Sequence, residues 1–306
     1  MNRVRRIIYA EELHRRGIRG KGITAAVMDS GICHHPDYSD RVVCFKDFVG
    51  YQTEAYDDAS HGSHVTGILG GNGVMSMGRY CGIAPECDLV HLKVLDRNGN
   101  GKVSAAIAAM DWVIRNQRKF NIRVLNFSAG VQENSQEEES RLLVEWIERV
   151  WDAGIAVVVA AGNMGPARGS VTVPGTSRKV ITVGFCDEVS GRHRSIRRGQ
   201  YSGRGPTAEC ICKPEITAPG FQVTSCSNLR QASGYYCVKS GSSMATPVVA
   251  GAVCLLLSVH PELTNVEVKM RLRRSGDDLG LPMEQQGWGR INLLKFLDDP
   301  TGMIHA

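Results

Sequence analysis

The sequence predicts an α/β protein with a doubly wound, three-layer fold and a mostly parallel central sheet. Two observations support this prediction. Short apolar runs of strand length recur along the chain, and amphipathic helical patterns lie between them. This alternation is typical of right-handed βαβ crossovers, which place helices on both faces of one parallel sheet.

Each element follows from its own pattern. The first strand, 23–28, is a run of Ile, Thr, Ala, Val and Met that ends at the carboxylate of Asp29. The later strands are apolar runs rich in Val, Ile and Leu, and they cover residues 89–95, 122–127, 155–160 and 180–183. Helices are predicted over 103–120 and 137–151, because apolar residues recur there every three or four positions.

Length and composition indicate a single domain over residues 1–306, with 1–20 as an N-terminal segment. The chain has 306 residues, 42% of them hydrophobic, which is enough to bury one large core. Its net charge of +5 comes from 36 basic and 31 acidic residues, so neither nucleic acid nor an anionic membrane is predicted as a partner. The most apolar helical run, 250–259, is much shorter than the roughly 20 residues of a membrane span. None of these features predicts the oligomeric state.

Polar residues follow several of the predicted strands. Asp29 ends the first strand, Ser128 comes directly after 122–127, and Asn163 comes shortly after 155–160. In open parallel sheets, ligands bind beyond the carboxyl ends of the strands. These three residues are therefore candidates for a functional site.

Three short segments combine a carboxylate, an imidazole and a hydroxyl with small neighbours. Asp29 lies in V-M-D-S-G, His61 in H-G-S-H-V-T-G-I, and Ser243 in G-S-S-M-A-T-P-V-V-A-G. Hydrolysis of a peptide bond at neutral pH needs a nucleophile, a base that takes its proton, and a group that fixes the tautomer of the base. Because Pro247 is tolerated in the first turn of a helix, we expect a helix to begin near Ser243, which places this hydroxyl at the positive end of the helix dipole.

Each segment alone also has an ordinary structural interpretation. Asp29 could end a strand in a turn, and Ser243 could be a helix N-cap. His61 and His64 could form a metal pair, but their segment offers no third ligand, so we interpret His61 as a base and His64 as structural. The order Asp, His, Ser differs from that of the α/β-hydrolases, whose serine lies in G-x-S-x-G. The three segments together favour catalysis.

The segments resemble the signatures of the subtilases, D-[ST]-G, H-G-T-H-V-A-G and G-T-S-M-A-x-P. Ser63 and Ser242 stand in place of threonines, and Thr66 stands in place of an alanine. The resemblance runs from about residue 20 to 297 and includes blocks in the family's order, such as 82–85, 126–130, 160–163 and 218–220. In character the chain is most similar to bacterial intracellular subtilisin-like proteases.

This resemblance implies a subtilisin-like serine endopeptidase that works through an acyl-enzyme intermediate on a peptide or protein substrate. In that mechanism Ser243 attacks the scissile carbonyl, His61 moves the proton, and Asp29 orients His61. Asn163 matches the asparagine of the family's oxyanion hole. The alternative is a subtilase-fold pseudoenzyme that acts as a regulatory scaffold, but all four residue types are present.

The resemblance also implies where a peptide would bind. An extended substrate would add as a strand between two segments of small residues, namely Gly99, Asn100 and Gly101 on one side and Ser128, Ala129 and Gly130 on the other. The pocket for the residue before the scissile bond would be walled by 128–130 and by Ala161 and Gly162, with Thr172 near its base. None of these residues is acidic, so a weak preference for apolar or medium-sized side chains is expected.

No cofactor is required for this chemistry, but structural calcium is common in the family. Oxygen ligands of the kind that calcium prefers are present near the catalytic segments, in Asp37, Asp40, Asp47, Asp57 and Asp58. A solvated acidic loop explains these aspartates equally well, so both interpretations stay open.

The ten cysteines and the start of the chain bear on location. No apolar export signal is visible, and in a chain of this size the cysteines are then expected to remain thiols in the cytoplasm. Secreted members of the family carry a signal and a prodomain, and neither is recognisable here. A trimmed secreted form is the alternative, which Met1 and the cysteines disfavour. The cysteine spacing, which has no C-x-x-C pair, does not predict a zinc site.

Overall fold

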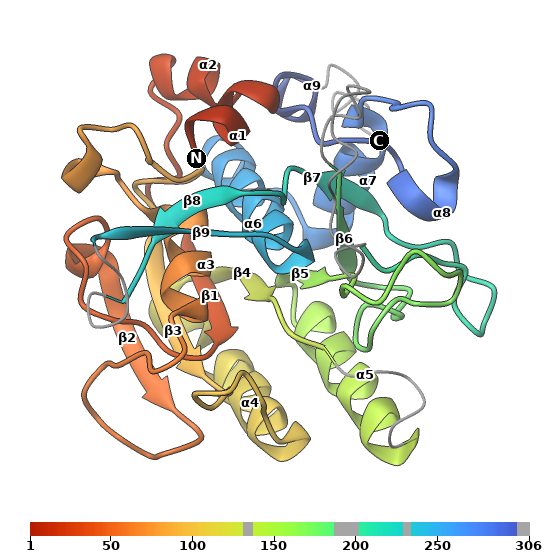
Figure 1. The fold of residues 1–306 in the computed structure, drawn as a ribbon, viewed down its shortest axis with the longest axis horizontal. Helices are drawn as coiled ribbons and strands as arrows, with labels where there is room; N and C mark the ends of the chain where they lie inside the picture. The colour runs from red at the N-terminus through yellow and green to blue at the C-terminus, as the bar shows by residue number, and fades with distance from the viewer. Residues whose placement is uncertain (131–136, 187–201, 229–233, 299–306) are drawn as a thin grey trace.

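A parallel sheet forms the centre of the computed structural model, which describes residues 1–130, 137–186, 202–228 and 234–298 (Figure 1). The sheet has seven strands in the order β2-β3-β1-β4-β5-β6-β7, and each neighbouring pair is parallel. Its strands are β1 (Thr24–Asp29), β2 (Val42–Asp47), β3 (Asp88–Lys93), β4 (Ile122–Phe127), β5 (Ala156–Ala160), β6 (Ile181–Phe185) and β7 (Ile216–Ala218). The predicted fold class is confirmed.

Helices cover both faces of this sheet. On one face α3 (His61–Gly70) packs against α6 (Ser242–Val259), and on the other α4 (Val103–Phe120) packs against α5 (Glu137–Asp152) (Figure 1). An antiparallel hairpin of β8 (Val223–Cys226) and β9 (Tyr236–Lys239) lies over α3. The remaining helical segments are α1 (Asn2–Ile7), α2 (Ala10–Arg15), η1 (Ser39–Arg41), η2 (Val74–Ser76), α7 (Asn265–Ser275), α8 (Met283–Gln286) and α9 (Leu293–Leu297).

The elements predicted from periodicity lie where they were expected. β4 and α4 have the predicted bounds, and the other predicted strands and α5 agree within two residues at each end. The prediction missed β2, β7 and the hairpin. β2 is an edge strand whose residues are mostly half-exposed, and β7 has only three residues. Neither gives the continuous apolar run that marks a strand buried on both faces.

Helix α6 forms much of the core. It is 18 residues long with a mean hydropathy of 1.8, and 83% of it is buried inside the protein. Among the described residues it is the single helix long and apolar enough to cross a membrane, a test that core helices also pass. The apolar run at 250–259 is the second half of this helix, which begins at Ser242, one residue from the predicted start. Pro247 lies in the second turn instead of the first, so the Ser243 carbonyl lacks the N–H that an ordinary residue 247 would donate.

The path of the chain through the sheet fixes where a site can form. From the central strand β1 the chain moves to one edge through β2 and β3, then crosses to β4 on the other side of β1. Such a reversal of direction opens a crevice beyond the carboxyl ends of the two strands. Asp29 ends β1, and Ser128 follows β4 directly. The two residues therefore lie at neighbouring strand ends on the same edge of the sheet.

Candidate active site

Asp29 and His61 form a hydrogen-bonded pair at this edge. The Asp29 side chain is fully buried, and its Oδ1 lies 2.7 Å from Nδ1 of His61, the first residue of α3. Burial alone would raise the pKa of Asp29, but the charge and hydrogen bond of His61 and the Ser30 N–H outweigh it, and the pKa is lowered. Burial likewise opposes charge on His61, yet Asp29 raises the pKa of His61 above 6.5.

The carboxylate of Asp57 holds the segments around Asp29 and His61 in this relation. Its Oδ1 accepts hydrogen bonds from the Ser30 hydroxyl at 2.9 Å and from the Ser60 N–H at 2.9 Å. Its Oδ2 accepts from the N–H and the hydroxyl of Ser63, at 2.8 and 2.6 Å. Ser30 follows Asp29, and Ser60 precedes His61. Asp57 therefore fixes the end of β1 against the first turn of α3.

From its sequence context Asp57 was predicted only as a candidate calcium ligand. Three N–H groups and two hydroxyls now surround its carboxylate, which is the arrangement of an anchored turn. The available signal was its position, since an aspartate a few residues before a helix start commonly accepts N–H groups of the first turn. Lys93 was also missed. Its buried ammonium group donates to the Ser30 and Leu95 carbonyls, at 2.5 and 2.9 Å, next to the end of β1.

Ser243 lies in the first turn of α6, close to the end of β4. The turn before the helix depends on Gly241, whose φ of +143° favours glycine. The Ser243 hydroxyl donates to the Ser128 carbonyl at 2.9 Å, so in this structure it faces the strand end and not His61. Catalytic hydrogen bonds often form only when a substrate is bound. A different side-chain rotamer of Ser243 would then direct its hydroxyl toward His61.

Asn163 lies beside the start of the same helix. Its Oδ1 accepts a hydrogen bond of 2.9 Å from the Ser242 N–H, and the amide packs against Gly241. Because a backbone N–H requires an acceptor, this contact fixes the orientation of the amide and leaves Nδ2 as its donor end. The Ser243 N–H belongs to the first helical turn, whose N–H groups have no intrahelical partner. Asn163 Nδ2 and the Ser243 N–H are therefore two donors that can stabilise a negative charge developing near the Ser243 hydroxyl.

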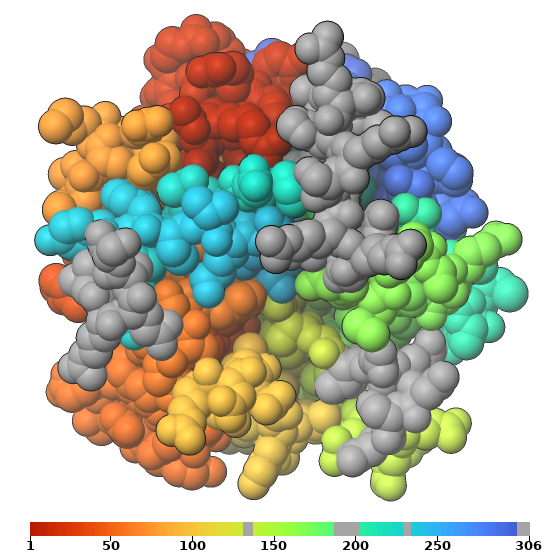
Figure 2. Space-filling model, in the orientation of Figure 1, coloured from red at the N-terminus to blue at the C-terminus, as the bar shows by residue number. Residues whose placement is uncertain are grey.

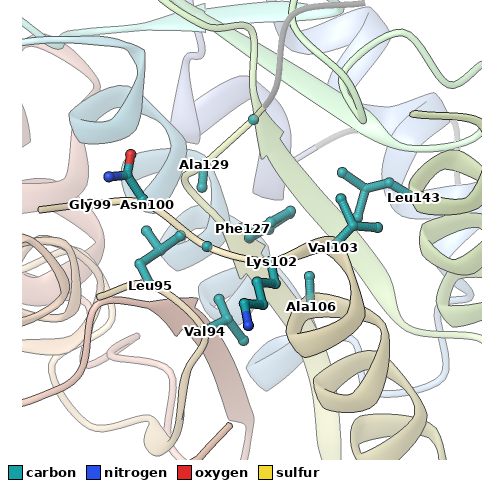
Figure 3. Close-up of a pocket in the computed structure, with 12 residues that line it drawn as sticks. Val94, Leu95, Gly99, Asn100, Lys102, Val103, Ala106, Phe127, Ala129 and Leu143 are labelled. Carbon is teal, nitrogen blue, oxygen red and sulfur yellow. The ribbon is translucent and has the colours of Figure 1, made fainter. Parts of the chain in front are cut away.

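The two expected substrate segments border one pocket. Its volume is about 180 Å³, and its walls include Gly99, Asn100 and Gly101 on one side and Ala129 and Gly130 on the other. Most side chains that line it are apolar, and Figure 3 shows them, among them Leu95, Val103, Ala106, Phe127 and Leu143, together with Lys102. The Asn100 amide points away from this apolar lining (Figure 3). The gap between the segments can therefore hold an apolar side chain.

Thr172 lies between the other two expected wall segments. A Cβ added to Gly130 or Gly162 would come within 2.6 or 2.5 Å of the Thr172 side chain. The backbone N–H of Thr172 donates to the Ala161 carbonyl at 3.1 Å. The absence of side chains at both glycines thus lets three segments approach closely around Thr172, which is 7% exposed.

His64 was interpreted from the sequence as a structural residue. His64 is fully buried, its Nε2 contacts the carbonyls of Val223 and Cys237, and burial lowers its pKa to about 3. It therefore connects α3 to the hairpin, as its structural interpretation required.

The aspartates proposed for calcium have separate surroundings. Asp47 accepts three backbone N–H groups and the Tyr56 hydroxyl, Asp58 contacts Lys93 at 2.7 Å, and Asp40 lies at the surface 3.7 Å from Arg41. Asp37 is buried elsewhere, beside His35 and Cys226. This geometry gives the calcium hypothesis no common centre within the described residues.

Comparison with known proteins decides the family. Residues 20–289 match the subtilase family. The chain belongs to this family. It is 38% identical over 291 residues to the serine protease AprX of Bacillus subtilis, an alignment that covers 88% of this chain and 65% of AprX. It is 34% identical to subtilisin E of the same species over 94% of this chain and 68% of that protein. With the minor extracellular protease Epr, also of Bacillus subtilis, it shares 31% identity over 98% of this chain and 42% of Epr.

This subtilase thus spans about two thirds or less of the length of these relatives. Membership in the family agrees with the fold and with the motifs around Asp29, His61 and Ser243. None of these residues is replaced, so no observation favours a pseudoenzyme.

Proposed function

We propose that this subtilase is a serine endopeptidase whose catalytic residues are Asp29, His61 and Ser243. The observation that carries the proposal is the 2.7 Å contact between buried Asp29 and His61, on a helix that packs against α6, where Ser243 lies in the first turn. A buried carboxylate paired with a half-buried imidazole is the arrangement that prepares a general base for a serine nucleophile.

The orientation of His61 determines its part in the reaction. Because Nδ1 faces the Asp29 carboxylate, the proton of the neutral imidazole lies on Nδ1, and Nε2 keeps its lone pair. Nε2 takes the proton of the Ser243 hydroxyl as Oγ attacks the scissile carbonyl, and it then returns the proton to the leaving amine. Asp29 stabilises the imidazolium in between, as the raised pKa of His61 supports.

The tetrahedral intermediate carries a negative charge on the former carbonyl oxygen. We assign its stabilisation to the Asn163 side-chain amide and the Ser243 N–H. The hydrogen bond from Ser242 to Asn163 Oδ1 supports this role, because it orients Nδ2 before any substrate binds. Preoriented donors need not reorganise during the reaction, which is why they stabilise the transition state effectively.

The substrate is an extended peptide that binds as a strand between residues 99–101 and 128–130. The pocket between these segments accepts one of its side chains. We expect Gly130, Ala161, Gly162 and Thr172, which lie close together, to border the place of another. Replacing Ala106, which lines the first pocket, by leucine should lower kcat/KM about tenfold or more for peptides with a large apolar side chain there. Peptides with alanine at that position are the control, and an equal loss for both would contradict the assignment.

The reaction needs no cofactor, and we place the enzyme in the cytoplasm. All ten cysteines lie in described parts of the chain, and none is in a disulfide, which suits a reducing compartment. The extracellular relative Epr makes the opposite location the natural competitor. Cell fractionation with an antibody against the chain decides between them.

Covalent labelling with a fluorophosphonate probe tests the catalytic assignment. We expect the native protein and the Ser242→Ala variant to be labelled and the Ser243→Ala variant to remain unlabelled, because only an activated serine reacts. Circular dichroism establishes that each variant is folded. Absence of labelling in the folded native protein would refute the proposal, as would labelling that persists in Ser243→Ala.

A further inference from the structure

A second group of ligand-type side chains lies outside the active site. His35, Asp37 and Cys226 are 0%, 0% and 1% exposed, and one ligand atom of each lies within 4.8 Å of the other two. The parts of the chain that the structure describes contain no other such group of three. His35 and Asp37 follow β1, whereas Cys226 is the last residue of β8. The fold therefore brings together ligand types that are almost two hundred residues apart.

His35 turns Nδ1 toward the group. Its Nε2 lies 2.9 Å from the Tyr235 carbonyl, a contact that requires a proton on Nε2 and leaves the lone pair on Nδ1. This lone pair accepts the Asp37 N–H at 3.1 Å, a hydrogen bond that a metal ion on Nδ1 would replace, and Nδ1 lies 3.9 Å from Asp37 Oδ1. Because Nδ1 accepts a hydrogen bond, it carries no proton and the ring is neutral. Histidines that bind metals commonly donate their other N–H to a backbone carbonyl in this way.

Asp37 is a buried carboxylate surrounded by neutral donors. Oδ1 accepts the Met75 N–H at 3.0 Å, and Oδ2 accepts the Tyr236 hydroxyl at 2.7 Å. The Cys226 thiol donates to Oδ2 at 3.6 Å. Arg41 reaches the backbone carbonyl of Asp37 and not its carboxylate. A buried negative charge is stabilised best by a positive partner, and no charged side chain of the described residues fills that place.

The spacing of the three atoms is close to that around a tetrahedral metal ion. Zinc bonds of about 2.0 Å to nitrogen and oxygen and 2.3 Å to sulfur place neighbouring ligand atoms roughly 3.3 to 3.7 Å apart. Here Sγ lies 3.6 Å from Oδ2 of Asp37, and Nδ1 lies 3.9 Å from Oδ1, the other oxygen of the same carboxylate. With one ligand atom taken from each residue, no separation exceeds 4.8 Å. A contraction of at most about 1.5 Å at the widest separation would produce the bound geometry, with a water as fourth ligand.

We propose that His35, Asp37 and Cys226 form a binding site for Zn²⁺. A thiol, an imidazole and a carboxylate together suit zinc, whereas calcium and magnesium prefer sites made of oxygen ligands. On binding, the Cys226 S–H bond breaks, a Zn–S bond forms, and the proton leaves to solvent. His35 is already neutral, so one proton is released for each ion bound.

The ion would join parts of the protein that border the catalytic segments without entering the reaction. The hairpin β8–β9 lies at the surface between the N-terminal helices and the residues around β2 (Figure 2), and it packs on α3, which begins at His61. Because the ion would bind Cys226 as well as His35 and Asp37, it would connect this hairpin to the segment that follows Asp29. The expected consequence is higher stability with zinc and an unchanged chemical step.

Metal analysis in the Ser243→Ala background tests the site without self-digestion. After incubation with Zn²⁺ and extensive dialysis, we expect one zinc per chain in the parent and less than a tenth of that in Cys226→Ser and His35→Gln. Cys237→Ser is the matched control, because it removes a thiol from the same hairpin outside the group, and it should retain the zinc. Equal zinc in the Cys226→Ser variant, or none in the folded parent, would overturn the proposal.

Two measurements on the parent protein guard against variants that fail to fold. Cobalt should bind with the intense near-ultraviolet absorption of a thiolate ligand and the visible bands of tetrahedral cobalt. Zinc addition in weak buffer should release about one proton per chain and raise Tm. A cobalt spectrum without the thiolate band, or zinc binding without proton release, would show that Cys226 is not a ligand.

Discussion

The described part of the chain contains two histidine–aspartate pairs whose surroundings differ. In the pair at the candidate active site, His61 Nδ1 lies 2.7 Å from Asp29 Oδ1, and Asp29 raises the pKa of His61 against the effect of burial. In the second pair, His35 Nδ1 lies 3.9 Å from Asp37 Oδ1, and burial lowers the pKa of His35. Both aspartates are fully buried, so the depth of the carboxylate does not distinguish the pairs.

The difference is the ring nitrogen that carries the proton. In His61 the carboxylate holds the proton on Nδ1 and leaves the lone pair on Nε2. In His35 the Tyr235 carbonyl holds the proton on Nε2 and leaves the lone pair on Nδ1, where it accepts the Asp37 N–H. The same two residue types would therefore provide a general base in the proposed triad and metal ligands in the proposed zinc site.

The largest expected effect comes from exchanging each carboxylate for an amide. Asp29→Asn should lower kcat by about 10⁴-fold, because an asparagine no longer holds His61 in the reactive tautomer. Asp37→Asn should change kcat far less while abolishing zinc binding. Steady-state kinetics and metal analysis on both variants measure this contrast. If Asp37→Asn lost as much activity as Asp29→Asn, the two pairs would not have separate functions.

Asn163→Ala should have the next largest effect, and it should change catalysis without changing zinc binding. Loss of one oxyanion donor should lower kcat by about 10²- to 10³-fold with little change in KM, a magnitude known for subtilisin, a member of the same family. Zinc binding at His35 should not change. The Asn163→Asp variant is a useful control, because it keeps the acceptor for the Ser242 N–H but removes the donor. An increase in KM alone would assign Asn163 to substrate binding.

Much of the fold could be predicted because the buried strands and helices show their periodicity directly. The edge strand β2 could not, since its half-exposed residues lack a continuous apolar pattern. The position of Pro247 was predicted wrongly, because it is the sixth residue of α6 and lies in the second turn. Sequence patterns record burial better than they record the exact start of a helix.

The candidate site likewise contains residues that the sequence indicated and residues that it did not. Asp29, His61, Ser243 and Asn163 lie in short motifs, so the sequence indicated them even though each alone had an ordinary interpretation. Asp57 and the group around Cys226 have no such signal, because their function depends on hydrogen bonds and contacts made by distant segments. The absence of a C-x-x-C pair argued against a zinc site. That pattern detects only ligands that are close together in the chain, whereas Cys226 is almost two hundred residues from His35 and Asp37.

The pH dependence of catalysis sharpens the comparison further. Only neutral His61 can act as the base, so kcat/KM should rise about tenfold per pH unit below an apparent pKa that lies above 6.5. Asp29→Asn should move this midpoint downward, because the residue that raises the pKa of His61 is lost. Cys226→Ser should leave the midpoint in place. A rate profile with its midpoint below 6.5 in the native enzyme would contradict the charge that Asp29 exerts on His61.

The smallest expected effect concerns the pH dependence of stability. His61 contributes with one sign, and the buried residues His64 and His35 contribute with the opposite sign. The pKa of His61 is raised on folding, so its contribution to the free energy of unfolding is present below pH 6.5 and is lost as pH rises through the folded value. His64 and His35 have lowered pKa values, to about 3 for His64, so the unfolded chain binds more protons and stability falls as pH drops below 6.5. Urea unfolding of Ser243→Ala between pH 4 and 8 measures the sum. Replacing His64 by glutamine should flatten the acid side of that curve, and an unchanged acid slope would show that His64 is protonated in the folded protein.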